Sequence, residues 1–169
     1  MYFELDAQSF CGNMKINIVA VGKVKEKYFA EGIAEYVKRM GRYASVSVKE
    51  TEEEYLPDKV NRAIIDNALK KEGERIMPAL KGYIVALCIE GKKIGSEELA
   101  EVIERAKTSF GEITFVIGSS YGLCESVKEA ANYKLSLSDM TFPHTMARLI
   151  LTEQLYRALN IISGGKYHK

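Results

Sequence analysis

The segment ITFVIGSSYGLCESVKEAANYKLSLSDMTFPH, residues 113–144, carries the strongest indication of how this chain folds. It holds two strand-like runs, each followed by a loop of small and polar residues, and the chain then turns into a long helix at Pro143. A glycine at a strand end allows a ligand to approach the main chain and allows a tight turn. Such loops at neighbouring strand ends predict a pocket of backbone amides and carbonyls, which suits a small polar cofactor better than a metal ion.

The apolar runs along the chain predict an α/β fold. Continuous runs at 15–21, 83–89 and 113–117 are typical of parallel strands that are covered on both faces. The run at 45–50 alternates apolar and polar residues, which favours an edge of the sheet. Helical patterns lie at 26–40, 58–77, 96–110, 123–132 and 143–160. Because strands and helices alternate strictly, we expect a parallel sheet with helices on both sides, in three layers.

Length and composition indicate one soluble domain. The chain has 169 residues, of which 47% are hydrophobic and 28% charged, and a formal net charge of +1. Residues 1–13 show no settled period and are interpreted as an added extension, so the domain is expected at 14–169. No apolar run reaches the roughly 18 residues that a membrane span needs. Cys11, Cys88 and Cys124 are too widely spaced for a zinc site or a disulfide framework, which favours a cytoplasmic location.

The final helical pattern is apolar around most of its circumference. Its apolar residues are Met146, Ala147, Leu149, Ile150, Leu151, Leu155 and Leu159. A helix with so little polar surface has to be buried on more than one side, and a subunit interface would bury it. The sequence therefore predicts a homodimer.

The pattern Gly118-Ser119-Ser120-Tyr121-Gly122 matches the G-x-S-x-G turn of serine hydrolases. Asp139 and then His144 or His168 follow in the order of a catalytic triad. Against this interpretation, no HGGG-like segment is present to form an oxyanion hole, and the chain is short for such an enzyme. A small hydrolase that uses Ser120 is therefore kept only as an alternative.

The C-terminal residues SGGKYHK combine cations with an aromatic ring. Tyr167 offers a stacking face, and Lys166, His168 and Lys169 offer charge, which is how proteins hold single-stranded bases and their phosphates. A frayed chain end is the structural alternative. Glu153 and Arg157 stand four residues apart on the last helix, close enough to act together at a site. The structural alternative is a surface ion pair that stabilises the helix. These residues favour a nucleic acid as the partner, so an RNA-binding module without catalysis is a further alternative.

Four separated motifs resemble the ribosomal large subunit methyltransferase H family, a branch of the SPOUT methyltransferases. They are VIGSSYGL at 116–123, LSLSDMTFPH at 135–144, EQLYRA at 153–158 and the terminal YHK. The resemblance extends to the opening KINIVAVGKVKEKY, at 15–28, and covers essentially all of the chain from Met14 onward.

The resemblance implies a fold, a reaction and a cofactor. It implies a SPOUT fold with a C-terminal trefoil knot, a homodimer, and methylation of N3 of a pseudouridine in 23S ribosomal RNA with S-adenosylmethionine as the donor. The implied cofactor contacts are Leu87, Gly118, Leu137, Ser138, Asp139, Met140, Thr141 and Phe142. The usual glycine pair after the strand is here Gly118-Ser119, which departs from the family pattern.

The expected mechanism is direct attack of the uracil nitrogen on the methyl group, without a metal. His168 is the expected base because its pKa lies near neutrality, and Glu153 is its rival. Arg157, Tyr167, Lys166 and Lys169 are expected to hold the RNA. In such families the tail of one subunit can complete the pocket of the other. The substrate can be free RNA, the large subunit or the assembled ribosome.

Overall fold

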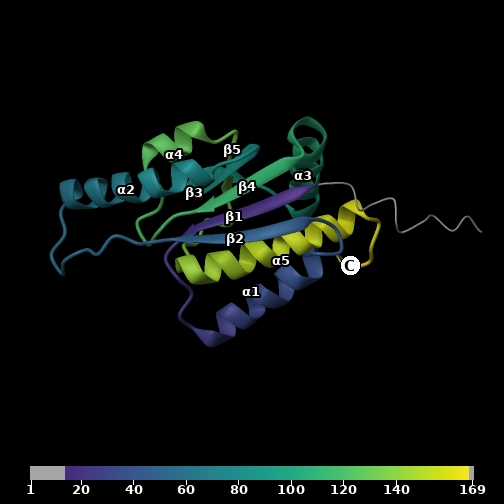
Figure 1. Ribbon diagram of the computed structural model, residues 1–169, viewed down its shortest axis with the longest axis horizontal. Coiled ribbons are helices and arrows are strands. Elements are labelled where there is room, and N and C mark those ends of the chain that lie inside the picture. Colours follow the sequence, from purple (N-terminus) through teal and green to yellow (C-terminus); the bar gives the residue numbers. More distant parts are fainter. Residues whose placement is uncertain (1–13, 168–169) are drawn as a thin grey trace, which may run out of the picture.

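The computed structural model describes residues 14–167, so the expected extension at 1–13 and the tail residues His168 and Lys169 lie outside the described part. Strands and helices alternate within that part (Figure 1). The strands are β1 (Lys15–Val21), β2 (Ser45–Thr51), β3 (Tyr83–Lys93), β4 (Glu112–Ile117) and β5 (Tyr133–Ser136). The helices are α1 (Lys27–Met40), α2 (Arg62–Ile76), the 3-10 turn η1 (Met77–Ala79), α3 (Ser96–Phe110), α4 (Glu125–Ala130) and α5 (His144–Ile162).

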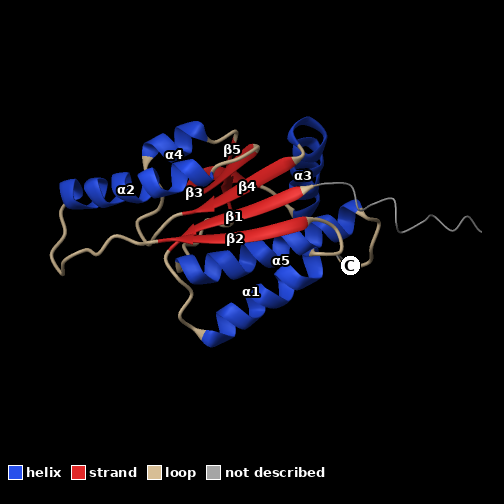
Figure 2. Cartoon of the chain, in the orientation of Figure 1, coloured by secondary structure: helices blue, strands red, loops and turns tan. Residues whose placement is uncertain are grey.

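The described strands form one parallel sheet in the order β2-β1-β4-β3-β5. The predicted α/β class is confirmed, and so is the edge position of the strand predicted at 45–50. Helices α1, α3 and α5 lie on one face and α2 and α4 on the other (Figure 2). The alternation of side chains explains this, since Ile16, Ile18 and Ala20 of β1 face the first group of helices, whereas Val19 and Val21 face the second.

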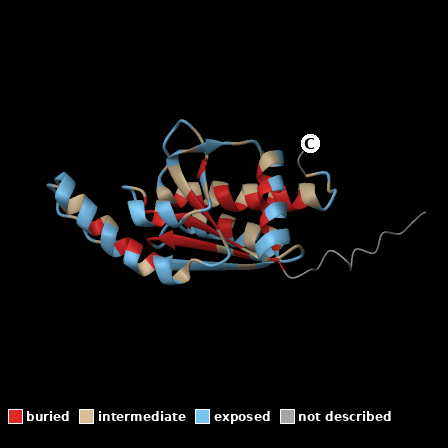
Figure 3. Cartoon of the chain, turned by 90° about the horizontal axis from the view of Figure 1, so that it is seen from above, coloured by how far each residue is buried: buried red, intermediate tan, exposed pale blue. Residues whose placement is uncertain are grey.

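Helix α5 is buried mostly by its own chain. It lies on the sheet beside α1 and α3, and Leu151, Leu155 and Ala158 have no exposed surface. In Figure 3 the buried residues gather in the middle of the molecule, around the sheet. Its broad apolar circumference therefore does not by itself require a partner subunit, because two neighbouring helices and the sheet already cover it. The homodimer stays a prediction that needs other support.

Strand β3 is longer than the apolar run at 83–89 indicated, because it continues past β4 and pairs twice with β5. Leu135 of β5 is paired with Leu87 and again with Lys92, so the register of β3 shifts between these two residues, as in a β-bulge. Gly91 makes this close approach possible, since a Cβ atom built there would lie 2.5 Å from the carbonyl carbon of Leu135. The bulged part of β3, residues 87–90, lines the same cavity as the end of β5.

Candidate functional site

The bulged part of β3, residues 87–90, and the loops that follow β4 and β5 converge on one cavity of about 640 Å3. The convergence follows from the fold, because the carboxyl ends of neighbouring parallel strands share one edge of the sheet. The walls combine apolar side chains with the backbone of the loops, and the volume lies in the range of roughly 300–1,000 Å3 that is usual for small-molecule sites. The turns that the sequence analysis singled out therefore meet in a single cavity.

The structure brings together most of the expected cofactor contacts. Leu87, Gly118, Leu137, Ser138, Met140, Thr141 and Phe142 all line the cavity. Asp139 is not among the lining residues, and its exposed side chain forms an ion pair with Lys93, the last residue of β3. Its short neighbour Ser138 instead shapes the loop, because the Ser138 hydroxyl accepts a hydrogen bond from the Met140 amide at 3.0 Å.

The loop after β4 is a tight turn that only glycine at position 118 allows. A Cβ atom on Gly118 would lie 2.0 Å from the carbonyl oxygen of Gly122, far inside contact distance. Gly122 itself adopts a φ of 87°, a left-handed conformation that other residues rarely take. The Gly122 amide donates a hydrogen bond to the Ser119 carbonyl at 2.9 Å, which closes the turn. All five residues of this turn, 118–122, line the cavity.

A buried carboxylate supports this turn from behind, and the sequence analysis missed it. Glu72 of α2 is 3% exposed, and its carboxylate accepts hydrogen bonds from the Ser119 hydroxyl at 2.9 Å and the Glu54 amide at 3.0 Å. Burial raises the pKa of Glu72, and the nearby carboxylates of Glu53 and Glu54 act in the same direction, while the two donated hydrogen bonds oppose the shift. No sequence signal marks Glu72, because a Glu within a helix is normally solvated.

The raised pKa of Glu72 predicts a pH dependence of stability. The carboxyl group of Glu72 binds its proton more tightly in the folded chain than in the unfolded chain. Its contribution to the free energy of unfolding is therefore fully favourable below the unfolded pKa and is lost as the pH rises through the folded pKa. We expect the melting temperature of Glu72→Gln, relative to the wild type, to rise as the pH increases from about 4.5, the ordinary pKa of a glutamate, through the higher folded pKa of Glu72. Paired thermal melts across this range measure the difference. A difference that falls with pH would contradict the assignment.

The start of α5 forms another wall of the cavity. His144 and Ala147 line it, and Arg148 on the next turn is almost fully buried. The Arg148 guanidinium donates to the Gly22 carbonyl at 2.8 Å and pairs with Glu50, so it ties the helix to the ends of β1 and β2. This buried arginine fixes the wall in place and interrupts the otherwise apolar pattern of the helix.

The geometry does not form the triad of a serine hydrolase. Ser120 and His144 both line the cavity, yet within residues 14–167 no hydrogen bond joins them. Asp139 pairs with Lys93, not with a histidine. The hydroxyl that is held by a carboxylate belongs to Ser119, and there the partner Glu72 contacts it directly without a base between them.

The described tail residues gather at the end of α5. Arg157 donates to Glu153 Oε1 through Nη2 at 2.6 Å and Nε at 3.1 Å, and its guanidinium lies 4.8 Å from the centre of the Tyr167 ring. Tyr167 packs edge-on against Tyr156, and its amide donates to Asn160 Oδ1 at 2.9 Å. A hydrogen bond with Tyr36, together with burial, raises the pKa of Tyr167 to about 12. Up to Tyr167 the tail is therefore folded back on its own chain, while Lys166 is exposed.

This tail cluster lies far from the cavity of the same chain. With a rise of about 1.5 Å per residue, α5 carries Arg157 roughly 20 Å along its axis from His144. Figure 1 shows the two ends of α5 at opposite ends of the sheet. The structure thus brings Glu153, Arg157 and Tyr167 together but does not bring them to the expected cofactor contacts.

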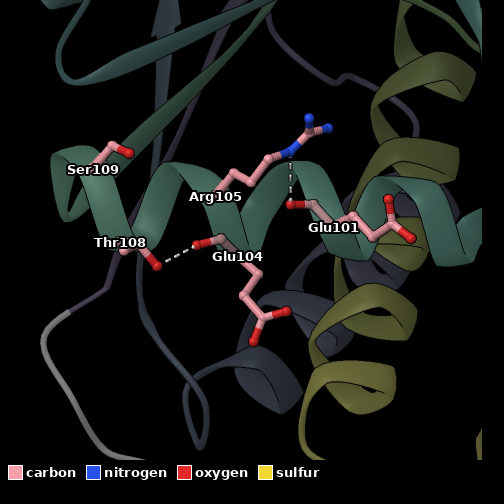
Figure 4. A pocket seen from close by; sticks show the side chains of 5 residues that line it. All are labelled: Glu101, Glu104, Arg105, Thr108 and Ser109. Carbon is pink, nitrogen blue, oxygen red and sulfur yellow. Dashed lines mark hydrogen bonds between the residues drawn. The ribbon is translucent and has the colours of Figure 1, made fainter.

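A second hollow lies on the outer face of α3 and has a different character. Glu101, Glu104, Arg105, Thr108 and Ser109 line it, all from one helix (Figure 4). The hydrogen bonds of Arg105 and Thr108 there run to backbone carbonyls of the same helix. Since no second element contributes, the hollow is helix surface and lacks the converging polar groups of a binding site.

Within the described residues, no three His, Cys, Asp or Glu side chains gather as a metal ion would require. No helix in residues 14–167 is long and apolar enough to cross a membrane. The cavity that Gly118 and Leu137 line is therefore the candidate active site of this chain.

Comparison with known proteins identifies the family. The family described as "Predicted SPOUT methyltransferase" matches residues 14–168. This chain belongs to the SPOUT methyltransferase family. The matched region begins where β1 begins, and it includes the cavity loops and the tail cluster.

Relatives within this SPOUT family share almost half of their residues with the chain. Ribosomal RNA large subunit methyltransferase H from Carboxydothermus hydrogenoformans is 48% identical over 160 residues, which is 92% of this chain and 100% of that protein. The enzyme of the same name from Limosilactobacillus fermentum is also 48% identical, over 159 residues, with the same coverage. The chain is therefore a full-length homologue of this rRNA methyltransferase.

Solved structures agree at the level of the fold. A probable methylase family protein from Haemophilus influenzae has a TM-score of 0.51 at 17% identity, covering 93% of this chain and 70% of that one. A putative methylase family protein from Neisseria gonorrhoeae has a TM-score of 0.51 at 13% identity, covering 92% of this chain and 85% of that one. At such low identity these structures support the architecture only.

Proposed function

We propose that the chain transfers a methyl group from S-adenosylmethionine to N3 of a pseudouridine in 23S ribosomal RNA. The observation that carries this proposal is the single cavity formed by residues 87–90 of β3 and the loops after β4 and β5. It supports a donor site because its tight glycine turn and apolar walls suit an adenosyl group, and because relatives 48% identical over their full length are named for this class of reaction. The same reasoning favours one SPOUT domain over residues 14–169 and work in the cytoplasm, where ribosomes are.

The lining of the cavity supports the assignment of the donor to it. Gly118, Ser138 and Thr141 bring polar groups of the loops to the cavity, and Leu87 offers an apolar wall. When bound, S-adenosylmethionine supplies an activated methyl group. The task of the chain is to hold the acceptor ring in line with that group and to remove one proton, and positioning of this kind can contribute roughly 7–11 kcal/mol.

We infer that a homodimer assembles the complete site from two chains. The support is the distance of roughly 20 Å along α5 between the cavity and the tail cluster of one chain. That distance is too long for the tail of the same chain, from Tyr167 onward, to act at a base above its own cavity. In a dimer with two-fold symmetry, the tail of one subunit can lie at the cavity of the other.

Within the tail, His168 is the favoured base and Glu153 the weaker candidate. The two carboxylate oxygens of Glu153 are already occupied, Oε1 by Arg157 and Oε2 by Gln154 Nε2 at 2.7 Å. We assign Arg157, Tyr167, Lys166 and Lys169 to holding the RNA. His168 and Lys169 lie outside the described residues, so their roles rest on the family resemblance and on their chemistry.

We infer that the C-terminal part of the chain forms the trefoil knot of this family. The support is the family resemblance together with the close approach of β3 to β5, where Leu135 pairs with both Leu87 and Lys92. Gly91 permits a contact that any larger residue would block.

The direct test is to incubate the purified chain and labelled S-adenosylmethionine with ribosomes that lack this methyl group. Free 23S rRNA, isolated large subunits and assembled ribosomes form three parallel arms. We expect label in one pseudouridine of 23S rRNA in at least one arm. RNA binding without transfer in all three arms would favour a non-catalytic RNA-binding module and would contradict the proposal.

A further inference from the structure

The carboxylate of Glu72 lies directly behind the wall of the donor cavity. Ser119 lines the cavity, and its hydroxyl donates to Glu72 Oε2 across 2.9 Å. Only one side chain thus separates this buried carboxylate from whatever occupies the cavity. The backbone amide of Glu54 holds the other carboxylate oxygen at 3.0 Å, so the group is fixed in place.

No cation is paired with Glu72 in the described part of the chain, in contrast to several other acidic residues near the cavity. Glu90 pairs with Lys128 at 2.6 Å, and Asp139 pairs with Lys93. Glu54, which contacts Glu72, pairs with Lys71 and Arg75. The two donors to Glu72, the Ser119 hydroxyl and the Glu54 amide, are neutral groups that favour its ionised form. When this carboxylate is ionised, its negative charge therefore has no cationic partner among residues 14–167.

We propose that Glu72 makes the cavity select cationic S-adenosylmethionine over its neutral product, S-adenosylhomocysteine. The two ligands differ by one methyl group and one positive charge. In the transfer, the methyl carbon forms a bond to N3 of the uracil ring, the electron pair of the broken bond stays on sulfur, and the N3 proton passes to the base. The sulfonium thus becomes a neutral thioether, and its attraction to the buried carboxylate disappears. Glu72 favours entry of the donor and departure of the product, acting through the electrostatic field and not by touching the reacting atoms.

Isothermal titration calorimetry on the full-length chain tests this selectivity. The probes are S-adenosylmethionine, sinefungin, which carries a cationic amine, and S-adenosylhomocysteine. In Glu72→Gln we expect the affinity for the two cationic ligands to fall roughly tenfold, while the affinity for S-adenosylhomocysteine stays within about twofold. Circular dichroism verifies folding, and Glu72→Met provides a second neutral variant if the glutamine variant does not fold.

Ser119→Ala is the matched control, since it removes the contact to the loop but keeps the charge. We expect it to weaken all three ligands by a similar factor and to retain the preference for cations. Equal weakening of the three ligands in Glu72→Gln, or loss of the preference in Ser119→Ala, would show that loop shape sets the affinities and would overturn the role of Glu72. A wild-type chain that binds none of the three ligands would overturn both this role and the assigned cofactor.

Discussion

Removal of residues 167–169 is expected to abolish methyl transfer, by about 1,000-fold or more, while the affinity for S-adenosylmethionine stays nearly unchanged. The physical reason is the separation of roles along α5, because the cavity lies at its start and the tail cluster beyond its end. Loss of the tail removes the expected base and the groups that hold the RNA but leaves every lining residue of the cavity. Single-turnover transfer to ribosomes and calorimetric titration of the donor measure the two quantities.

Tyr167→Phe controls for the structural part of this deletion. It keeps the ring that packs on Tyr156 and the amide that donates to Asn160, so the fold at the end of α5 should persist. A parallel loss of donor affinity and activity in the deleted chain would mean that the tail belongs to the donor site, against the division of roles proposed here.

Gly118→Ala should reduce the affinity for S-adenosylmethionine by at least about 100-fold, because displacements near 1 Å have effects of this size at well-fitted sites. The added Cβ atom would lie 2.0 Å from the Gly122 carbonyl oxygen, and that atom belongs to the backbone of the same turn. The turn must therefore open, which moves the main chain that faces the donor. Calorimetric titration of the donor measures the loss, and thermal melts report whether the fold survives.

Gly95→Ala is the matched control for this substitution. Gly95 precedes α3 with a φ of −80°, and a Cβ atom built there meets nothing within 4 Å. Its donor affinity should equal that of the wild type. Retained binding in Gly118→Ala would show that the turn does not shape the donor site.

The layers of the fold could be predicted from the sequence because each buried strand leaves a continuous apolar run. Lys15–Val21 matches β1 at both ends, and residues 96–110 match α3. The extension of β3 to Lys93 could not be predicted, since the residues after the apolar run, EGKK at 90–93, are not apolar and the second pairing forms only with β5. The spacing of apolar residues indicates which side chains of one element are buried. It does not indicate pairing between strands that are far apart in the sequence, as β3 and β5 are.

The position of the cavity could be predicted because parallel strands end at one edge of a sheet. The residue that supports its wall, Glu72, could not be predicted. Gly118 and the loop at 137–142 follow strands, and parallel strands place such loops at one edge. Glu72 comes from a helix on the opposite face of the sheet from α5 and has no partner nearby in sequence, so only the packed structure identifies it. The tail motif predicted which residues gather, Glu153, Arg157 and Tyr167, but not that they lie at the far end of α5 from the cavity.

The central claim is that each active site combines the cavity of one chain with the tail of another, and mixing two inactive chains tests it most directly. One chain carries Gly118→Ala and an intact tail, and the other has an intact cavity and lacks residues 167–169. Unfolded together and refolded as a mixture, they should recover up to about a quarter of wild-type transfer, because half of the dimers are mixed and each mixed dimer has one complete site. A mixture that stays as inactive as its components, although mixed dimers are present by mass spectrometry, would contradict the account.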